Sequence, residues 1–373
     1  MDKPTSKESQ TDGSGADLLT LRRRIDDIDD RILELVNQRL EAAQAIGRIK
    51  QDSGAAVVDS RRESEIYQRL LTRNTGSLKT AALYRIYKSL IAAGRSVQST
   101  RAGAEMPAVY AVFGDPVGHS LSPVMHNSAF AQTGFDGLYL AIRVKDIAAA
   151  VSGVRGLGIR GVSVTIPHKV SVMEYLDQVD EAAGKIGAVN TIVNRQGALC
   201  GFNSDSAGAI AALTQKCAIR GKAAAVIGAG GAARAVGFGI KQEGGQLTIL
   251  NRTREKGEAL ADDLDCEFRP LSETRRLPYD IIINATSVGM APHTDSSPVN
   301  TELLESGMVV MDMVYNPLQT RLLATAAKIG CTIVDGVAMF VHQGAVQFEL
   351  WTGKQAPVNV MRKVVLEELL YTK

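Results

Sequence analysis

The sequence predicts a multi-domain protein in which an all-α helical module is followed by an α/β region of two domains. Three observations lead to this division. The chain of 373 residues exceeds the size of one ordinary core. Residues 17–98 contain no proline and are rich in good helix formers. Beyond residue 107, short β-rich runs alternate with helical stretches, which is typical of a mainly parallel sheet covered by helices.

Composition excludes several classes of function. A formal net charge of +2 gives no broad basic field of the kind that nucleic-acid-binding proteins use. No apolar run approaches the roughly 18 residues of a membrane span, and segment 1–16 is polar, so we expect a disordered tail and a cytoplasmic protein. The cysteines have neither CxxC nor metal-ligand spacing, which predicts reduced thiols and no metal. They are Cys200, Cys217, Cys266 and Cys331.

Helical periodicity is clearest in the first predicted helix, from about residue 17 to Lys50. Its apolar residues alternate in spacing between three and four, as in a helix packed along a partner helix. These residues are Leu18, Leu21, Ile25, Ile28, Ile32 and Leu35. At 1.5 Å per residue the helix is roughly 50 Å long, more than a module of about 80 residues covers alone. GAAVVDSRRESEI breaks and restarts the pattern, TRNTGS precedes a third helix at 78–98, and 99–107 is a polar linker.

A glycine-rich turn predicts a Rossmann-type domain over 206–336. The run KAAAVI leads into GxGxxA and then into a helical stretch, with Gly228, Gly230 and Ala233 at the marked positions. Small residues there permit a tight turn and let backbone N–H groups approach a pyrophosphate. The residues expected to cradle this group are Gly228, Ala229, Gly230, Gly231, Ala232 and Ala233.

The next predicted strand, LTILN, ends in a basic cluster. About 20 residues after the turn, an NAD enzyme places Asp or Glu against the ribose hydroxyls. Guanidinium and ammonium groups pair instead with a 2′-phosphate, so the sequence predicts NADP. The cluster comprises Asn251, Arg252, Thr253, Arg254 and Lys256. Taken alone, it also fits a solvated basic loop.

Two further stretches suit a small hydroxylated or carboxylated ligand. Ser120 and Ser122 flank Leu121, and alternate side chains of an extended segment point the same way. Turn chemistry with a helix cap at Ser122 is the alternative. Lys169 ends the run SVTIPHK, where a buried strand reaches a turn. Reduction of a ketone needs a proton donor within hydrogen-bond reach of its oxygen, and Lys169 is a candidate.

A series of motifs runs through residues 108–373. They are SLSPxMHN, VTIPHK, GAVNT, GFNSDSAG, GAGGAARA, NRT, NATSVGM, VYNP and MFVHQGAVQFELWTG. In this order and spacing they resemble shikimate dehydrogenase. The resemblance implies reversible NADPH-linked reduction of 3-dehydroshikimate to shikimate, and a substrate-binding domain over 108–205 that helices at 337–373 complete. Ser204 replaces the family's usual threonine but keeps a hydroxyl, so we expect tuned activity.

The resemblance also assigns site residues. Lys169 and Asp205 would act at the reacting oxygen. The carboxylate favours a charged lysine and burial a neutral one, which leaves both a proton relay and an electrostatic clamp open. The expected substrate-binding residues are Ser120, Ser122, Thr165, Asn190, Tyr315 and Gln343. Those expected near the nicotinamide are Asn284, Thr286, Ser287 and Met339. The histidines beside prolines and turns, expected to form structural hydrogen bonds, are His119, His126 and His168.

Charged residues also gather in the helical module. At about 100° per residue, Arg39 and Lys50 lie roughly 20° apart on one face, whereas Arg22 is offset by about 100°. The residues that share a face of the next helix, at i, i+3 and i+4, are Asp59, Arg62 and Glu63. Cations beside two carboxylates suit a small dianion that bears a hydroxyl. A solvated helix face is the alternative.

The stretches LxxLRRRIDDIDDRILELVNQR, GRIK and DSRRE resemble the all-helical chorismate mutases over about 17–98. The resemblance implies rearrangement of chorismate to prephenate, which needs a site that holds the reactive conformer and stabilises charge on the breaking ether oxygen. It assigns Lys50 and Gln98 to that oxygen. The carboxylates and the hydroxyl region would be bound by Arg22, Arg39, Asp59, Arg62 and Glu63. Gly94 stands where the family carries serine, and the family's interlocked homodimer would place Arg22 in its partner's site.

The combined prediction is a bifunctional enzyme of aromatic amino-acid biosynthesis whose partners are small-molecule substrates and a second copy of the chain. One alternative is a shikimate or quinate dehydrogenase whose N-terminal helices only dimerise the protein. Retention of the mutase-type side chains disfavours it, because a scaffold needs none of them. A non-catalytic NADP-binding regulator is the other alternative, which the presence of both Lys169 and Asp205 disfavours. Quinate as substrate and NAD as cofactor stay open.

Overall fold

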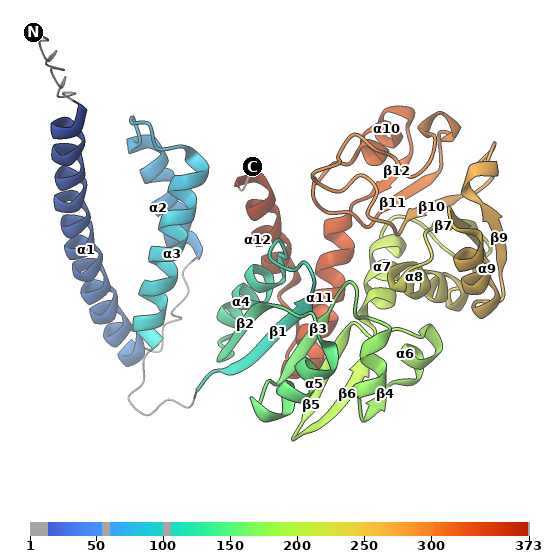
Figure 1. Ribbon diagram of the computed structural model, residues 1–373, viewed down its shortest axis with the longest axis horizontal. Helices are drawn as coiled ribbons and strands as arrows, with labels where there is room; N and C mark the ends of the chain where they lie inside the picture. The colour runs from blue at the N-terminus through green and yellow to red at the C-terminus, as the bar shows by residue number, and fades with distance from the viewer. Residues whose placement is uncertain (1–13, 54–59, 100–105, 372–373) are drawn as a thin grey trace, which may run out of the picture. The chain divides into compact units, whose positions relative to one another are not determined.

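The computed structural model describes residues 14–53, 60–99 and 106–371, and the chain divides after residue 105 into two compact units (Figure 1). The N-terminal unit is helical. Its elements are α1 (Ser14–Ser53), α2 (Ser60–Arg73) and α3 (Thr80–Ser99). At 40 residues, α1 is roughly 60 Å long, longer than the sequence pattern predicts. Among the described residues no helix is long and apolar enough to cross a membrane.

The C-terminal half of α1 packs against α3. Gly47 permits the close approach, because a Cβ placed there would lie 2.8 Å from the Cα of Gln98. Farther toward the N-terminus, the predicted apolar stripe is open to solvent. Its residues Leu21, Ile25, Ile28 and Ile32 are 44–55% exposed. One chain therefore leaves much of the long helix uncovered.

The second unit begins with a six-stranded sheet in the order β2-β1-β3-β5-β6-β4. Its strands are β1 (Ala108–Gly114), β2 (Gly137–Arg143), β3 (Gly161–Val164), β4 (Gln178–Val179), β5 (Thr191–Arg195) and β6 (Ala198–Phe202). The first three run parallel, and β5 and β6 add an antiparallel hairpin. The intervening helical elements are α4 (Ser122–Thr133), α5 (Ile147–Gly156), η1 (Ser171–Tyr175) and α6 (Glu181–Ile186).

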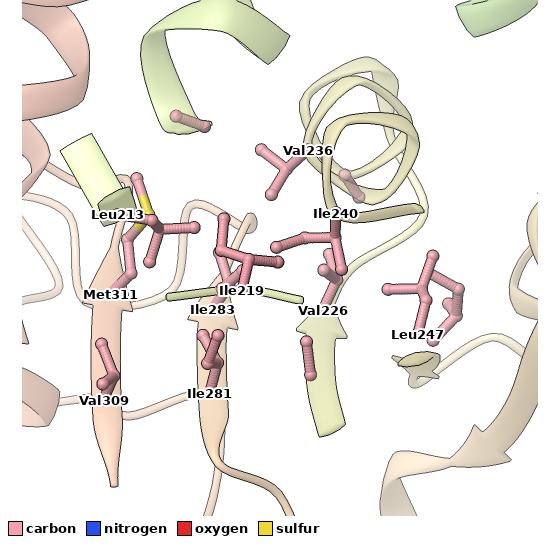
Figure 2. Packing of buried hydrophobic residues seen from close by; sticks show 14 of the residues in the cluster. Leu213, Ile219, Val226, Val236, Ile240, Leu247, Ile281, Ile283, Val309 and Met311 are labelled. Atoms are coloured by element: carbon pink, nitrogen blue, oxygen red, sulfur yellow. The ribbon is translucent and has the colours of Figure 1, made fainter. Parts of the chain in front are cut away.

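A second six-stranded sheet, wholly parallel, follows in the order β12-β11-β10-β7-β8-β9. Its strands are β7 (Ala223–Ile227), β8 (Gln246–Asn251), β9 (Glu267–Pro270), β10 (Ile281–Asn284), β11 (Val309–Asp312) and β12 (Thr332–Val334). The helical elements of this region are α7 (Ser204–Thr214), α8 (Gly231–Gln242), α9 (Arg254–Asp263), η2 (Leu271–Glu273), η3 (Thr301–Leu303) and α10 (Arg321–Ile329). Figure 2 shows branched side chains of β7, β10 and β11 packed under Val236 and Ile240 of α8. This strand order turns back beside β7, where open α/β sheets bind nucleotides.

The last helices, α11 (Gly336–Thr352) and α12 (Val358–Tyr371), return to the first sheet. Phe348, Met361 and Val365 share one core with Tyr110 of β1 and Phe130 of α4. Met339, near the start of α11, belongs instead to the core of the second sheet. Helix α11 thus joins the two halves of this unit.

Candidate active sites

The glycine-rich turn after β7 has the geometry of a phosphate cradle. Gly228 has φ +120°, and a Cβ there would lie 3.1 Å from Thr286 Cγ2. Only glycine fits such a position without strain. Gly230 caps α8, and a Cβ placed on it would meet nothing within 4 Å, so the space beside the turn is open. The first N–H groups of α8 face no helical acceptor and suit an anion, so these residues fit a dinucleotide pyrophosphate.

In the basic cluster after β8, one cation is bound by protein carboxylates and two others are available to a ligand. Arg254 pairs with Glu258 and Glu273 and lies over the ring of Phe268. Arg252 and Lys256 are exposed, and in the part of the chain that the structure describes no acidic side chain pairs with either. Arg252 is therefore the guanidinium available to a 2′-phosphate.

Lys169 and Asp205 form a mostly buried ion pair. Lys169 follows the end of β3, and Asp205 lies in the first turn of α7, which Asn203 caps. Lys169 Nζ lies 2.5 Å from Asp205 Oδ2, with the side chains 16% and 7% exposed. Asn190 Nδ2 donates to the other carboxylate oxygen at 2.8 Å. Both oxygens of Asp205 are therefore held, and the lysine ammonium is fixed by a charge-assisted bond.

This ion pair lies beside the glycine-rich turn. A Cβ placed on Gly231 would lie 3.5 Å from both Cβ and Cδ of Lys169, which is ordinary van der Waals contact. The aliphatic stem of the lysine therefore packs on the first residue of α8. The structure thus brings together two motifs that lie about 60 residues apart in sequence, and places the ammonium at the edge of the nucleotide cradle.

The predicted substrate-binding residues come from several elements. Gln343 of α11 is buried, and the Ser204 hydroxyl donates to its Oε1 at 3.4 Å. Ser204 also accepts from Asn190 Nδ2 at 3.0 Å, so Gln343 and Asn190 meet through this hydroxyl. The close approach of α11 to α7 depends on Gly208, where a Cβ would lie 2.7 Å from the backbone nitrogen of Gln343.

The SLSP turn lies beside Tyr315. Burial raises the pKa of Tyr315, and a hydrogen bond with the backbone of Leu121 opposes the shift. The Ser122 N–H donates to Ser120 Oγ at 3.3 Å, which fits the turn chemistry expected of these serines. Thr165 lies against Gly114, where a Cβ would come 2.3 Å from its Cγ2. Contacts of these side chains with a substrate remain a prediction.

The residues assigned to the nicotinamide differ in their surroundings. Asn284 is buried, and its carboxamide donates to Asp312 Oδ1 at 2.9 Å and accepts from Thr286. It therefore organises the loop after β10. Met339 is buried in the core of the second sheet, while Ser287 is exposed. Their contact with a cofactor stays a prediction.

The histidines follow the expected structural role only in part. His168 is buried, with Nε2 2.7 Å from the Val144 carbonyl oxygen. His126 is also buried, and neither ring nitrogen makes a hydrogen bond of normal geometry within the described residues, although the Gln347 side chain lies near enough to oppose the lowering of its pKa. Its ring stacks on Tyr139 at a centroid distance of 4.6 Å instead. Burial lowers the pKa of His126 to about 3, so the ring is neutral and packs as a flat apolar surface.

In the helical unit, several predicted mutase residues lie along the contact between α1 and α3. Arg39 Nη1 donates to the Leu90 carbonyl oxygen at 2.7 Å. A Cβ placed on Gly94 would lie 3.3 Å from the same nitrogen, so glycine leaves room for the guanidinium. Gln98 Oε1 is buried and has no partner among the described residues. Lys50 lies one turn beyond Gly47, the residue that packs on Gln98.

One residue of this region escapes the sequence pattern. Arg95 of α3 donates from Nε to Glu63 Oε1 at 2.8 Å, so a cation holds the carboxylate assigned to the substrate hydroxyl. The only sign of this role in the sequence is weak: Arg95 precedes Gln98 by three residues and therefore lies on the same face of α3. Arg62 pairs with Glu65 on the surface, Arg22 is exposed, and Asp59 lies outside the described residues.

Family models match most of the chain. Residues 112–192 match the shikimate dehydrogenase substrate binding domain, 211–313 the shikimate / quinate 5-dehydrogenase model, and 336–366 the shikimate 5′-dehydrogenase C-terminal domain. A shikimate dehydrogenase (NADP⁺) of Geobacillus kaustophilus is 46% identical over 274 residues, which cover 71% of this chain and 99% of the relative. The chain belongs to the shikimate dehydrogenase family.

Solved structures agree with this membership. A shikimate dehydrogenase in complex with NADP⁺ has a TM-score of 0.69 and 39% identity, and covers 72% of this chain and 99% of its own. Shikimate 5-dehydrogenase from Thermus thermophilus, in complex with NADP(H) and shikimate, has a TM-score of 0.66 and 36% identity, with coverage of 69% and 98%. Residues 21–99 match the chorismate mutase type II model, so this family member carries an N-terminal chorismate mutase domain.

Proposed function

We propose that the chain is a bifunctional enzyme that interconverts 3-dehydroshikimate and shikimate with NADP(H) and rearranges chorismate to prephenate. The observation that carries the dehydrogenase activity is the Lys169–Asp205 ion pair, packed against Gly231 of the dinucleotide turn. A proton donor and a nucleotide cradle in contact are what reduction of a ketone requires.

NADPH, when bound, supplies the hydride that adds to the carbonyl carbon. A lysine ammonium has three N–H groups, and one of those on Lys169 binds Asp205, which leaves two for the substrate oxygen. Lys169 donates a proton to that oxygen as negative charge develops there, so that one hydride and one proton convert the ketone to the alcohol. In the reverse direction the neutral amine of Lys169 accepts the proton from the hydroxyl, and the ammonium is restored.

The substrate carboxylate and hydroxyls are proposed to bind opposite this pair. Asn190 and Gln343 are buried, and Ser204 joins them, so together they form one polar wall. Tyr315 and the SLSP turn meet through Leu121 and are proposed to form another. The set assigned to the substrate is Ser120, Ser122, Thr165, Asn190, Tyr315 and Gln343.

For the mutase reaction, we assign Arg39 to a substrate carboxylate, and Lys50 and Gln98 to the ether oxygen. The orphaned Gln98 Oε1 supports a polar ligand at this point, since a buried amide oxygen without a partner among the described residues is costly. Arg22 is proposed to serve the site of a second chain in a homodimer, because the exposed apolar stripe of α1 needs cover. A cytoplasmic location is proposed because all four cysteines are free.

The deciding experiment incubates the purified protein separately with shikimate plus NADP⁺ and with chorismate, following NADPH absorbance and prephenate. Both products are expected. Lys169→Ala should nearly abolish NADPH formation while prephenate formation continues, because the two sites lie in separate folded units. Equal loss of both activities in folded protein would contradict two separate sites. Failure of chorismate to react would favour helices that only dimerise a dehydrogenase, and a faster reaction with quinate would reassign the substrate.

A further inference from the structure

A chain of buried polar side chains runs from β2 to Asn190. The Tyr139 hydroxyl donates to Ser163 Oγ at 2.6 Å, and Ser163 donates to Gln347 Oε1 at 2.8 Å. Gln347 Nε2 donates to Thr191 Oγ1 at 3.0 Å and to the Asn190 carbonyl oxygen at 3.3 Å. Gln347, on α11, is only 1% exposed. The roles already assigned to the active-site residues do not account for these hydrogen bonds.

The direction of every bond in this chain is determined. A backbone carbonyl only accepts, so the Asn190 oxygen requires the Nε2 end of Gln347. Oε1 then faces Ser163, whose hydroxyl must donate. Burial raises the pKa of Tyr139 well above its usual range, so the phenol keeps its proton and completes the row of donors.

The same direction continues to the reacting groups. Because Thr191 Oγ1 accepts from Gln347, its own proton is free for Asn190 Oδ1, at 2.7 Å. The Ser204 N–H donates to that same oxygen at 2.8 Å. The amide nitrogen of Asn190 is therefore the end that faces Asp205 Oδ1. Asp205 in turn holds Lys169.

We propose that Gln347 is a positioning residue for the dehydrogenase reaction, acting through Thr191 and Asn190 on the Asp205 carboxylate and hence on Lys169. This inference rests on the proposed dehydrogenase function. Gln347 is not a substrate-binding group: it is buried, both N–H groups of its carboxamide donate to protein atoms, and its oxygen accepts from Ser163. An apolar side chain of similar size at position 347 fills the space but frees the Thr191 hydroxyl to rotate away from Asn190. Asn190 then holds the Asp205 carboxylate less firmly.

The test compares Gln347→Met with Thr191→Val, because each removes one side of the same bond at similar volume. Each is expected to lower kcat for shikimate about tenfold, with KM for NADP⁺ and mutase activity within about twofold of wild type. The double variant should be no worse than either single one, because both act through one link. Gln215→Met, at an exposed glutamine bonded to His342, is the matched control and should change nothing.

The variant Gln347→Glu adds a second measurement, the pH dependence of activity, which would not change if Gln347 had a purely structural role. A protonated glutamic acid still donates toward Thr191, whereas a carboxylate faces the Asn190 carbonyl oxygen and repels it. The titratable groups around this position are Tyr139 from β2, neutral His126 from α4 and, beyond Asn190, Asp205 from α7. Burial and the Asp205 charge raise the pKa of the new carboxyl. Activity of Gln347→Glu should therefore fall toward that of Gln347→Met as pH rises, a transition absent from the other variants.

Three results would overturn the inference: kcat unchanged in Gln347→Met and Thr191→Val, additive losses in the double variant, or a pH profile of Gln347→Glu that matches wild type. If one of the two single variants does not fold, kcat of the other and the pH profile of Gln347→Glu still decide. Wild-type protein that oxidises no shikimate would instead reject the proposed function, and with it this inference.

Discussion

Gly208 fixes the distance between α7, which carries Asp205, and α11, which carries Gln343 and Gln347. A Cβ at this position would lie 2.7 Å from the backbone nitrogen of Gln343 and 2.8 Å from the Cβ of Gln343. Backbone atoms of a packed helix cannot move aside as a flexible side chain can, so Gly208→Ala must push the helices apart by several tenths of an ångström. Overpacking costs about 1–3 kcal/mol, and the helix propensity gained by alanine returns roughly 0.5–1 kcal/mol.

We expect Gly208→Ala to lose about 1–2 kcal/mol of stability in this unit and to raise KM for shikimate, because Gln343 moves with α11. Trp351, the single tryptophan of the chain, lies at the end of α11 and donates to the Ile192 carbonyl oxygen at 3.0 Å. Its fluorescence therefore reports urea unfolding of this unit alone. Gly153→Ala, in helix α5 where a Cβ meets nothing within 4 Å, is the control and should be neutral or stabilising. A Gly208→Ala protein as stable as this control, with unchanged KM, would refute the packing argument.

The remaining predictions concern both activities. Arg252→Asp should weaken NADP⁺ use, with each lost charge-assisted contact costing about 1.5–3 kcal/mol, and narrow the preference over NAD⁺; an unchanged ratio of kcat/KM values would mean that the phosphate lies elsewhere. Arg22→Ala and Arg39→Ala should each inactivate the mutase, yet co-refolding both should restore about a quarter of the activity, since random pairing makes about half heterodimers with one intact site; heterodimers without activity would exclude exchange of Arg22. Arg95→Met should lower mutase kcat/KM without affecting shikimate oxidation, because Glu63 loses its partner; an unaffected mutase would make the ion pair purely structural.

Local patterns predicted the parts of the site that lie in short contiguous motifs. The turn at Gly228 and the basic cluster at Arg252 follow from residue types whose backbone or charge requirements are evident in sequence. The pairing of Lys169 with Asp205 followed from the family likeness, and the structure places the two in contact. Confirmation of NADP as the cofactor of the family comes from its relatives.

Other features depend on tertiary contacts that no local pattern encodes. Gln347 bonds to Asn190, which lies 157 positions away in the sequence. Its position in α11 is that of an ordinary buried helix residue, so the sequence pattern gives no sign of this bond. Arg95 meets Glu63 only because α2 and α3 pack side by side. His126 was expected to form a structural hydrogen bond, but the ring stacks on Tyr139 and makes no bond of normal geometry within the described residues. In each case the decisive partner lies on another element.

The return of α11 and α12 to the first sheet has a consequence for biosynthesis. Phe348 and Met361 fill the core beneath Tyr110, so the core packed on the sheet that begins at Ala108 cannot be completed while residues 336–371 are still inside the ribosome. The helical unit, in contrast, has emerged entirely by then and can fold first. Folding of the mutase domain during translation would thus precede completion of the dehydrogenase core. Until α11 emerges, the apolar residues of β1 and α4 lack the helix that covers them, and this interval is the stage at which chaperones matter most.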